Sequence, residues 1–224
     1  MIRFLLLLAL LIPVRAQAQT QLPMDVTQWT LWTGGPDFLS QGVDSIFFDF
    51  PQTTWCGTPG TAGSDCGDVY SALTFDFRRG VALSGTLTAT FRVETVPSSP
   101  PNPVSFDWET EAGNTCFGTP ATTRFYMAEF VNSVKQSNTH RWYSSEPHSY
   151  ILQDSGGATI TLSVPLTQSN WQDVFNDGSV KGWNDTVHNV NRIGFVAGGG
   201  CYFGHAVSVS QGTASFQLYS FGWQ

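Results

Sequence analysis

Basic residues are scarce in this chain. It has 10 Lys and Arg against 17 Asp and Glu, a formal net charge of −7 over 224 residues, and no basic cluster. Binding to phosphate groups requires a high density of Lys and Arg, so this composition argues against nucleic acid as a partner and against anionic membrane surfaces. Long apolar runs are also lacking after residue 18, whereas a helix that spans a bilayer needs about 20 apolar residues.

The first 18 residues have the composition of a secretory signal peptide. Arg3 supplies the positive charge, Phe4 to Val14 form an apolar stretch, and Ala16-Gln17-Ala18 is a small-x-small cleavage site. The apolar stretch is too short to span a bilayer. We therefore expect a secreted protein, extracellular or periplasmic, whose mature chain begins at Gln19. No linker rich in Pro, Ser and Gly divides residues 19–224, so we expect one domain.

Cysteines are few as well. The four in the chain are Cys56, Cys66, Cys116 and Cys201, and an oxidising compartment favours disulfides. Four cysteines allow three pairings. The simplest joins Cys56 to Cys66 around a local loop and Cys116 to Cys201 across the chain. The spacing of these residues is not that of a zinc ribbon, so we expect disulfides and no metal ion at the cysteines.

Helical periodicity is scarce, and alternation of apolar and polar residues dominates. In the clearest run, residues 83–94, apolar side chains take nearly every second position, with Thr, Arg and Glu between them. A period of two is typical of a half-buried β-strand. About ten short runs of this kind, separated by turn residues, predict an all-β sandwich or barrel.

Three short segments predict breaks in this strand pattern. Arg78-Arg79-Gly80 is interpreted as a hairpin turn between two strands. Ser169 is a candidate N-cap for a helical turn over residues 171–175, and Asn184 for another over residues 185–190. Both turns are too short to be stable without the sheet beneath them.

An acidic stripe follows one expected strand. Asp107, Glu109 and Glu111 are two residues apart, so they project from one face at intervals of about 6.6 Å. The spacing resembles the Glu-x-Asp-x-Glu catalytic strand of laminarinase-like retaining glycosidases, with Asp107 and Glu109 departing from that pattern. The resemblance implies catalysis by Asp107 and Glu111, assisted by Glu109. A sugar-binding face and an ordinary solvated face are the alternatives.

Residues 140–143 combine charge with aromatic rings. Arg141 offers a planar fork of donors, and Trp142 offers a platform for a ligand. If Arg124 and Tyr126 belong to a neighbouring strand, the four side chains form one polar-aromatic surface. The alternative is that the arginines pair with nearby acids in a purely structural role.

A glycine triplet, Gly198-Gly199-Gly200, precedes His205. No helix with a Lys-Ser or Lys-Thr pair follows the triplet, so it is not a phosphate-binding loop. His205 is interpreted either as a ligand contact or as a structural, hydrogen-bonded histidine. None of the other histidines has metal-ligand spacing to it. The chain also lacks a Gly-x-Ser-x-Gly nucleophile motif.

No cofactor is expected. A structural calcium ion held by loop acids and carbonyl oxygens stays open as an alternative in a secreted sandwich, although no loop has the spacing of an EF-hand. The candidate ligands are Asp65, Asp68, Asp177 and Asp185.

The C-terminal half resembles galactose-binding-like jelly rolls and carbohydrate-binding modules. The segments that carry this resemblance are Ile160 to Val164, Pro165-Leu166, Trp171 to Val174, Val190 to Phe195 and Ala214 to Phe221. It implies an antiparallel two-sheet β-sandwich of jelly-roll type, with one or two short helical turns and a glycan on its concave face or loop rim.

These observations favour a secreted, non-catalytic carbohydrate-binding sandwich with a polysaccharide or glycan as its partner. A glycoside hydrolase using Asp107 and Glu111 is one alternative, and a structural cell-envelope or surface protein that binds another protein is the other. The oligomeric state stays open. The candidate ligand-binding residues are Asp107, Glu109, Arg124, Tyr126, Arg141, Trp142 and His205.

Overall fold

The computed structural model describes most of the chain after the expected signal peptide. The described residues are 19–32, 39–52, 71–99, 102–108, 120–132, 135–173, 180–199, 202–203 and 207–224. Several predictions fall outside them, namely those on residues 1–18, Cys56, Cys66, Cys116, Cys201, Asp65, Asp68, Asp177, Glu109, Glu111, Gly200 and His205.

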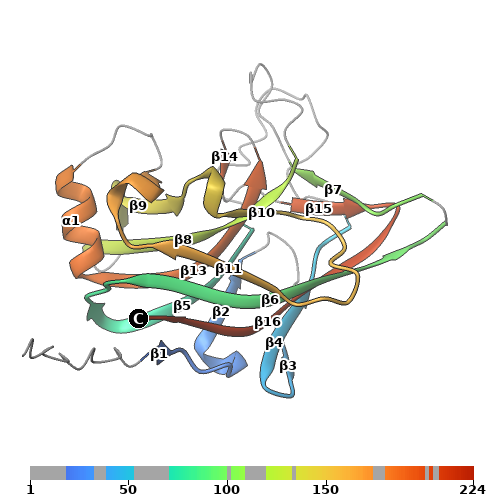
Figure 1. Cartoon of the computed structure of the whole chain (residues 1–224), viewed down its shortest axis with the longest axis horizontal. Coiled ribbons are helices and arrows are strands. Elements are labelled where there is room, and N and C mark those ends of the chain that lie inside the picture. Colours follow the sequence, from blue (N-terminus) through green and yellow to red (C-terminus); the bar gives the residue numbers. More distant parts are fainter. Residues whose placement is uncertain are drawn as a thin grey trace, which may run out of the picture.

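Two antiparallel sheets lie face to face (Figure 1). The six-stranded sheet has the order β11 (Ile160–Pro165), β6 (Thr86–Pro97), β16 (Gly212–Trp223), β4 (Ser45–Asp49) and β3 (Ser40–Gly42), with β1 (Thr20–Gln21) also on β16. The eight-stranded sheet has the order β12 (Trp171–Asp173), β9 (Lys135–Ser144), β8 (Thr122–Asn132), β13 (Val190–Gly199), β5 (Ser71–Val81) and β2 (Trp29–Trp32). In that sheet β10 (Ser149–Ile151) also pairs with β8, and β14 (Tyr202–Phe203) with β13.

A separate two-stranded ribbon joins β7 (Ser105–Trp108) to β15 (Val207–Ser210). The described helical elements are the α-helix α1 (Val180–His188) and the 3-10 turns η1 (Val26–Gln28), η3 (Glu146–His148) and η4 (Gln168–Asn170). The predicted all-β, two-sheet sandwich of jelly-roll type is confirmed. Among the described residues, no helix is long and apolar enough to cross a membrane.

The core lies between the two sheets and is built largely from phenylalanine. Phe91 of β6 stacks on Phe216 of β16 at 4.9 Å between ring centroids and meets Phe195 of β13 edge-on at 5.5 Å. The ring of Phe125 in β8 meets that of Phe221 edge-on, with 5.6 Å between ring centroids. Aromatic pairs at such distances add stability beyond the area that they bury. The half-buried strand that the alternation along residues 83–94 predicted is therefore confirmed, because one face of β6 lies in this core.

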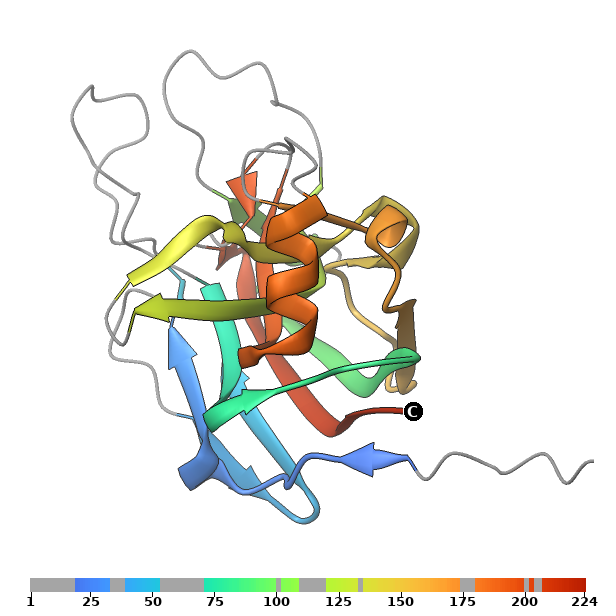
Figure 2. The same cartoon turned by 90° about the vertical axis from the view of Figure 1, so that its left-hand side faces the viewer.

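One end of the sandwich is covered by α1, as Figure 2 shows from that side. Its Trp183 packs edge-on against Trp142 of β9, with ring centroids 5.2 Å apart, and also contacts Trp171 of β12. Helix α1 includes residues 185–188 of the predicted turn over residues 185–190 and extends back to Val180, and Trp183 is the buried ring that packs it on the sheet. The other predicted turn is wrong for residues 171–173, which pair with β9 as an edge strand, and the helical turn η4 lies directly before them at Gln168–Asn170.

The predicted hairpin at Arg78-Arg79-Gly80 is wrong as well. These residues continue β5. The next strand in the sequence, β6, belongs to the opposite sheet, so the two strands cannot form a hairpin. The chain changes sheets over residues 82–85, where Gly85 has φ +79° and a Cβ atom would lie 1.5 Å from the Gln224 carbonyl oxygen. Glycine is needed at that point for both its backbone angle and its lack of a side chain.

Gly194 sits where the backbones of β13 and β5 come close. A Cβ atom there would lie 2.0 Å from the Leu73 carbonyl oxygen, in the middle of the eight-stranded sheet. We expect Gly194→Ala to lower the free energy of unfolding by about 3 kcal/mol, at the upper end for overpacking. Urea unfolding measures this. The control is Gly157→Ala in an exposed turn, where an added Cβ meets nothing within 4 Å but φ is +79°. That backbone angle alone should cost about 1 kcal/mol, so a loss as large as that of Gly194→Ala would contradict the expectation.

Candidate functional site

The structure brings together part of the predicted polar-aromatic surface. Strands β8 and β9 are neighbours, with Tyr126 opposite Tyr143 and Ala128 opposite Arg141. Because successive side chains point to opposite faces, Arg124, Tyr126 and Arg141 share the outer face of the eight-stranded sheet with Tyr143. The sequence thus predicted the neighbouring strands and the shared face of the two arginines.

Trp142 points the other way, into the core. Its side chain is fully buried and packs on Trp183. A ring inside the core has no face open to a ligand, so Trp142 leaves the set of candidate ligand residues.

Arg124 is held inside the protein by its neighbours. It is 2% exposed, and its guanidinium donates to the Ser144 carbonyl oxygen at 3.3 Å and to the Glu146 carboxylate. Burial lowers the pKa of Arg124 to about 10, so the group stays charged at neutral pH. These contacts tie β8 to the end of β9 and to η3, which is a structural role.

The tyrosines on this face are also buried. Tyr126 and Tyr143 are 6% and 7% exposed, and their ring centroids lie 5.7 Å apart. They form one apolar cluster with Ala72, Ala128 and Val196. Neither ring is open enough for a sugar to stack on it.

A further ion pair on this face was not predicted from the sequence. Arg192 of β13 donates to both carboxylate oxygens of Asp76 on β5, at 2.6 and 2.7 Å. Burial lowers the pKa of Arg192, but the hydrogen bonds and charge of Asp76 outweigh it, so the net shift is upward. The two side chains form a bidentate ion pair that links β5 to β13. The alternation along each strand predicts which face each side chain lies on. Only the register of β5 against β13 shows that Arg192 and Asp76 lie opposite each other.

Asp107 lies elsewhere, on the β7–β15 ribbon. Its carboxylate accepts hydrogen bonds from the hydroxyls of Ser105 at 3.0 Å and Ser210 at 2.6 Å. Because β7 and β15 form a two-stranded sheet of their own, Asp107 lies in a different sheet from Arg124 and Arg141. In the described part of the chain, no group of three or more His, Cys, Asp or Glu side chains has a geometry that could hold a metal ion. The calcium candidate Asp185 instead pairs with Lys181 and His140.

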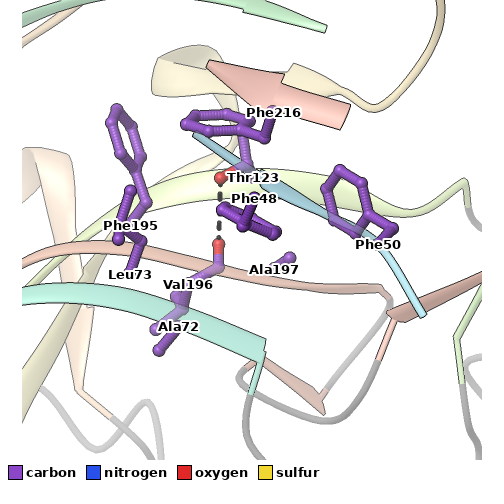
Figure 3. Close-up of a pocket in the computed structure, with 9 residues that line it drawn as sticks. All are labelled: Phe48, Phe50, Ala72, Leu73, Thr123, Phe195, Val196, Ala197 and Phe216. Atoms are coloured by element: carbon purple, nitrogen blue, oxygen red, sulfur yellow. Dashed lines mark hydrogen bonds between the residues drawn. The ribbon is translucent and has the colours of Figure 1, made fainter. Parts of the chain in front are cut away.

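A small cavity lies between the sheets (Figure 3). Its volume is about 20 Å³, and its walls include Phe48 and Phe216 from one sheet and Leu73 and Phe195 from the other. The Thr123 hydroxyl beside it donates to the Val196 carbonyl oxygen at 3.2 Å. Binding pockets for small molecules have volumes of about 300 Å³ or more, so this cavity is a packing gap in the core.

The outer face of the six-stranded sheet is open and polar. Alternation along β6, β16 and β4 turns Arg92, Gln217 and Phe47 outward, and the register places Gln217 between the other two. Glu94 and Tyr219 lie two residues further along their strands on the same face. We call these five residues, Phe47, Arg92, Glu94, Gln217 and Tyr219, the Arg92 platform. All five side chains are partly or fully exposed.

Hydrogen bonds fix the centre of this platform. The Gln217 side-chain oxygen accepts from Arg92 Nη2 at 2.9 Å and from the Tyr219 hydroxyl at 2.8 Å. Its Nε2 atom donates to the hydroxyl of buried Ser45 at 2.8 Å. The Arg92 guanidinium carbon lies 5.9 Å from the Tyr219 ring centroid, within cation–π range. The side chains are therefore held in place before any ligand arrives.

Strand β16 has a β-bulge at Tyr219. The pairing of β16 with β6 shifts between Leu218 and Ser220, which leaves Tyr219 as the extra residue. Bulges bend a strand and re-aim its side chains. Tyr219 keeps the outward side that alternation from Gln217 gives it, and the extra residue turns Phe221 into the core, where it contacts Phe125. The sequence alternation suggested the outward positions of Arg92 and Glu94, but it carries no signal for the bulge.

Charge on the platform is balanced between Arg92 and Glu94, and Asp49 beside it makes the surrounding face slightly acidic. Arg92 Nε lies 3.3 Å from Glu94 Oε1, an ion-pair contact without hydrogen-bond geometry. Asp49 is exposed and lies in the same cross-strand row as Glu94. A guanidinium has five N–H donors, and the contacts with Gln217 and Glu94 use two of its three nitrogen atoms. The surface thus presents donors and acceptors beside exposed aromatic carbon.

Comparison with known proteins gives a loose likeness in fold. No protein-family model matches the chain, and no curated protein matches its sequence. A solved structure of a mutant from carbohydrate-binding module family 29, described as probing ligand recognition, is similar with a TM-score of 0.38 and 10% identity. The alignment covers 92% of this chain and 84% of that one. The resemblance concerns the fold, and the ligand of that module is not carried over to this chain.

Proposed function

We propose that the protein is a secreted, non-catalytic carbohydrate-binding sandwich that holds a glycan on the Arg92 platform. The observation that carries this proposal is the preorganised set of Arg92, Gln217 and Tyr219 on an open sheet face. Rigid placement on strands lowers the entropy that binding would otherwise cost.

The chemistry of the platform suits a sugar. Hydroxyl groups both donate and accept hydrogen bonds, and the platform supplies donors from Arg92 and acceptors from Glu94. The rings of Tyr219 and Phe47 offer apolar faces for the C–H side of a sugar ring, and tyrosine adds a polar edge. A few placed polar groups beside aromatic carbon is the usual composition of a small-molecule site.

The hydroxyl-rich strands around the platform extend this surface. Thr90 of β6 lies 3.3 Å from Thr161 of β11 between hydroxyl oxygens, and Thr88 lies 3.2 Å from Ser163. Each hydroxyl keeps a lone pair or a proton for a further partner. The sheet face therefore offers more than one contact to a chain of sugar units.

Tyr219 variants test the stacking role. We expect Tyr219→Ala to weaken glycan binding about tenfold, because the ring that covers the sugar and supports Arg92 is lost. Tyr219→Phe keeps the ring and loses only the hydrogen bond to Gln217, so its effect should be about threefold or less. Titration calorimetry on the bound glycan measures both. Equal effects of the two variants would contradict a stacking role.

The function itself is tested on a broad glycan array, with release of reducing sugar measured on the same polysaccharides. Binding without release supports the proposal. Release that Glu111→Gln abolishes would instead favour the hydrolase hypothesis with Asp107 and Glu111. If neither binding nor release occurs on any glycan, the proposal fails, and a structural or protein-binding role takes its place.

A further inference from the structure

A groove opens at the end of β6 and the start of β16. Its volume is about 490 Å³, which is within the range of ligand sites. The lining residues that matter here are Gln52, Val96, Ser98, Ser210, Gln211 and Thr213. They combine amide and hydroxyl groups with one large apolar side chain, Val96, which is 66% exposed.

The groove continues the Arg92 platform along the strands. Strands β6 and β16 pair Arg92 with Gln217 and, four residues further along β6, Val96 with Thr213. Alternate residues share a face, so Val96 and Thr213 lie on the same side as Arg92. At about 3.3 Å per residue, the groove begins roughly 13 Å from Arg92. An extended ligand that lies along the strands therefore reaches it.

Backbone geometry singles out one residue of the groove. Gln211, between β15 and β16, has φ +64°, in the left-handed region that glycine favours. Its carbonyl oxygen accepts from the Ser98 backbone N–H at 2.9 Å, and its side chain is exposed. A glutamine held in this conformation costs stability that glycine would not. Such strain is often kept for function.

Acidic groups outnumber basic ones along this path. Glu94 and Asp49 lie on the sheet face beside Arg92, and Asp107 contacts the groove residue Ser210. Like charges across a surface disfavour binding. A polyanionic chain would meet this field along most of its length, whereas an uncharged chain would not.

We infer that a linear, uncharged glycan chain lies along β6 and β16, from Tyr219 to the groove, where the Gln211 side chain contacts its distal units. This inference rests on the proposed function and deepens it by giving the ligand a shape, a direction and a charge.

Gln211→Gly separates fold from binding. The probes are laminari-, cello- and chito-oligosaccharides from disaccharide to hexasaccharide, titrated by calorimetry against the mature protein. Wild-type affinity for at least one neutral series should rise with length. Gln211→Gly should weaken hexasaccharide binding about three- to tenfold, the loss of one or two hydrogen bonds, and leave the disaccharide unchanged. Its Tm should not fall, because glycine relieves the left-handed backbone.

The matched control is Asp44→Gly in the β3–β4 turn, where a non-glycine residue has φ +54°. It should leave binding unchanged at every length. If Gln211→Gly also leaves hexasaccharide binding unchanged while Tyr219→Ala still weakens the disaccharide, the inference is overturned and the proposed function stands. If oligogalacturonides, which are anionic, bind more tightly than the neutral series, the inference that the ligand is uncharged is overturned. If no oligosaccharide binds the wild type, both proposals fail.

Discussion

Replacing Trp142 with alanine is expected to lower the free energy of unfolding by about 3–5 kcal/mol, the usual cost of removing a buried aromatic side chain. Trp142 is fully buried and packs against Trp183 of α1, so its loss leaves a void at the end of the sandwich that α1 covers. Urea or thermal unfolding measures the change.

The same variant separates stability from binding. Glycan affinity per folded molecule should stay at the wild-type value, because Trp142 faces the core and not a ligand. Trp142→Phe should lose less stability, since it keeps an aromatic ring. A Trp142→Ala protein that unfolds like the wild type but no longer binds glycan would put Trp142 back among the ligand contacts.

Removal of the Arg92 side chain should weaken glycan binding roughly 30-fold. A hydrogen bond from a charged group contributes about 2 kcal/mol, which corresponds to that factor in Kd. Arg92→Ala also removes a partner of Gln217 and the cation that lies over Tyr219. Titration calorimetry with the glycan found on the array gives the change in Kd.

The control for Arg92 removes the same charge elsewhere. Arg79→Ala acts at an exposed position of β5 in the opposite sheet, and it should leave the Kd within twofold of the wild type. Equal losses from Arg79→Ala and Arg92→Ala would mean that net charge, and not the platform, determines binding.

Much of the fold was predictable because its signal is local. Alternation along residues 83–94 depends only on which face of a strand is buried, and β6 follows it. The pairing of strands depends on contacts between distant segments, which explains the error at Arg78-Arg79-Gly80. Arginines and a glycine are typical of a turn, yet β5 continues past them to Val81, which pairs with Val190 of β13 beyond a register shift.

The candidate site was less predictable, because exposure is a property of the whole fold. Arg124, Tyr126 and Arg141 share a face as expected, but packing buries Arg124 and Tyr126. Tyr219 lies on the side of β16 that alternation from Gln217 gives it, but no local pattern indicates the bulge beside it or the exposure of that sheet face. The disulfides and the roles of Glu109 and His205 stay predictions, since these residues lie outside the part of the chain that the structure describes.

Mapping a bound glycan by NMR tests the central claim most directly. With an oligosaccharide that binds, chemical-shift changes should concentrate on β6 and β16, with the largest effects at Arg92, Gln217 and Tyr219. Residues on the outer face of β8 and β9 should change little. Shifts confined to Tyr126, Arg141 and their neighbours would contradict the account and move the site to the eight-stranded sheet.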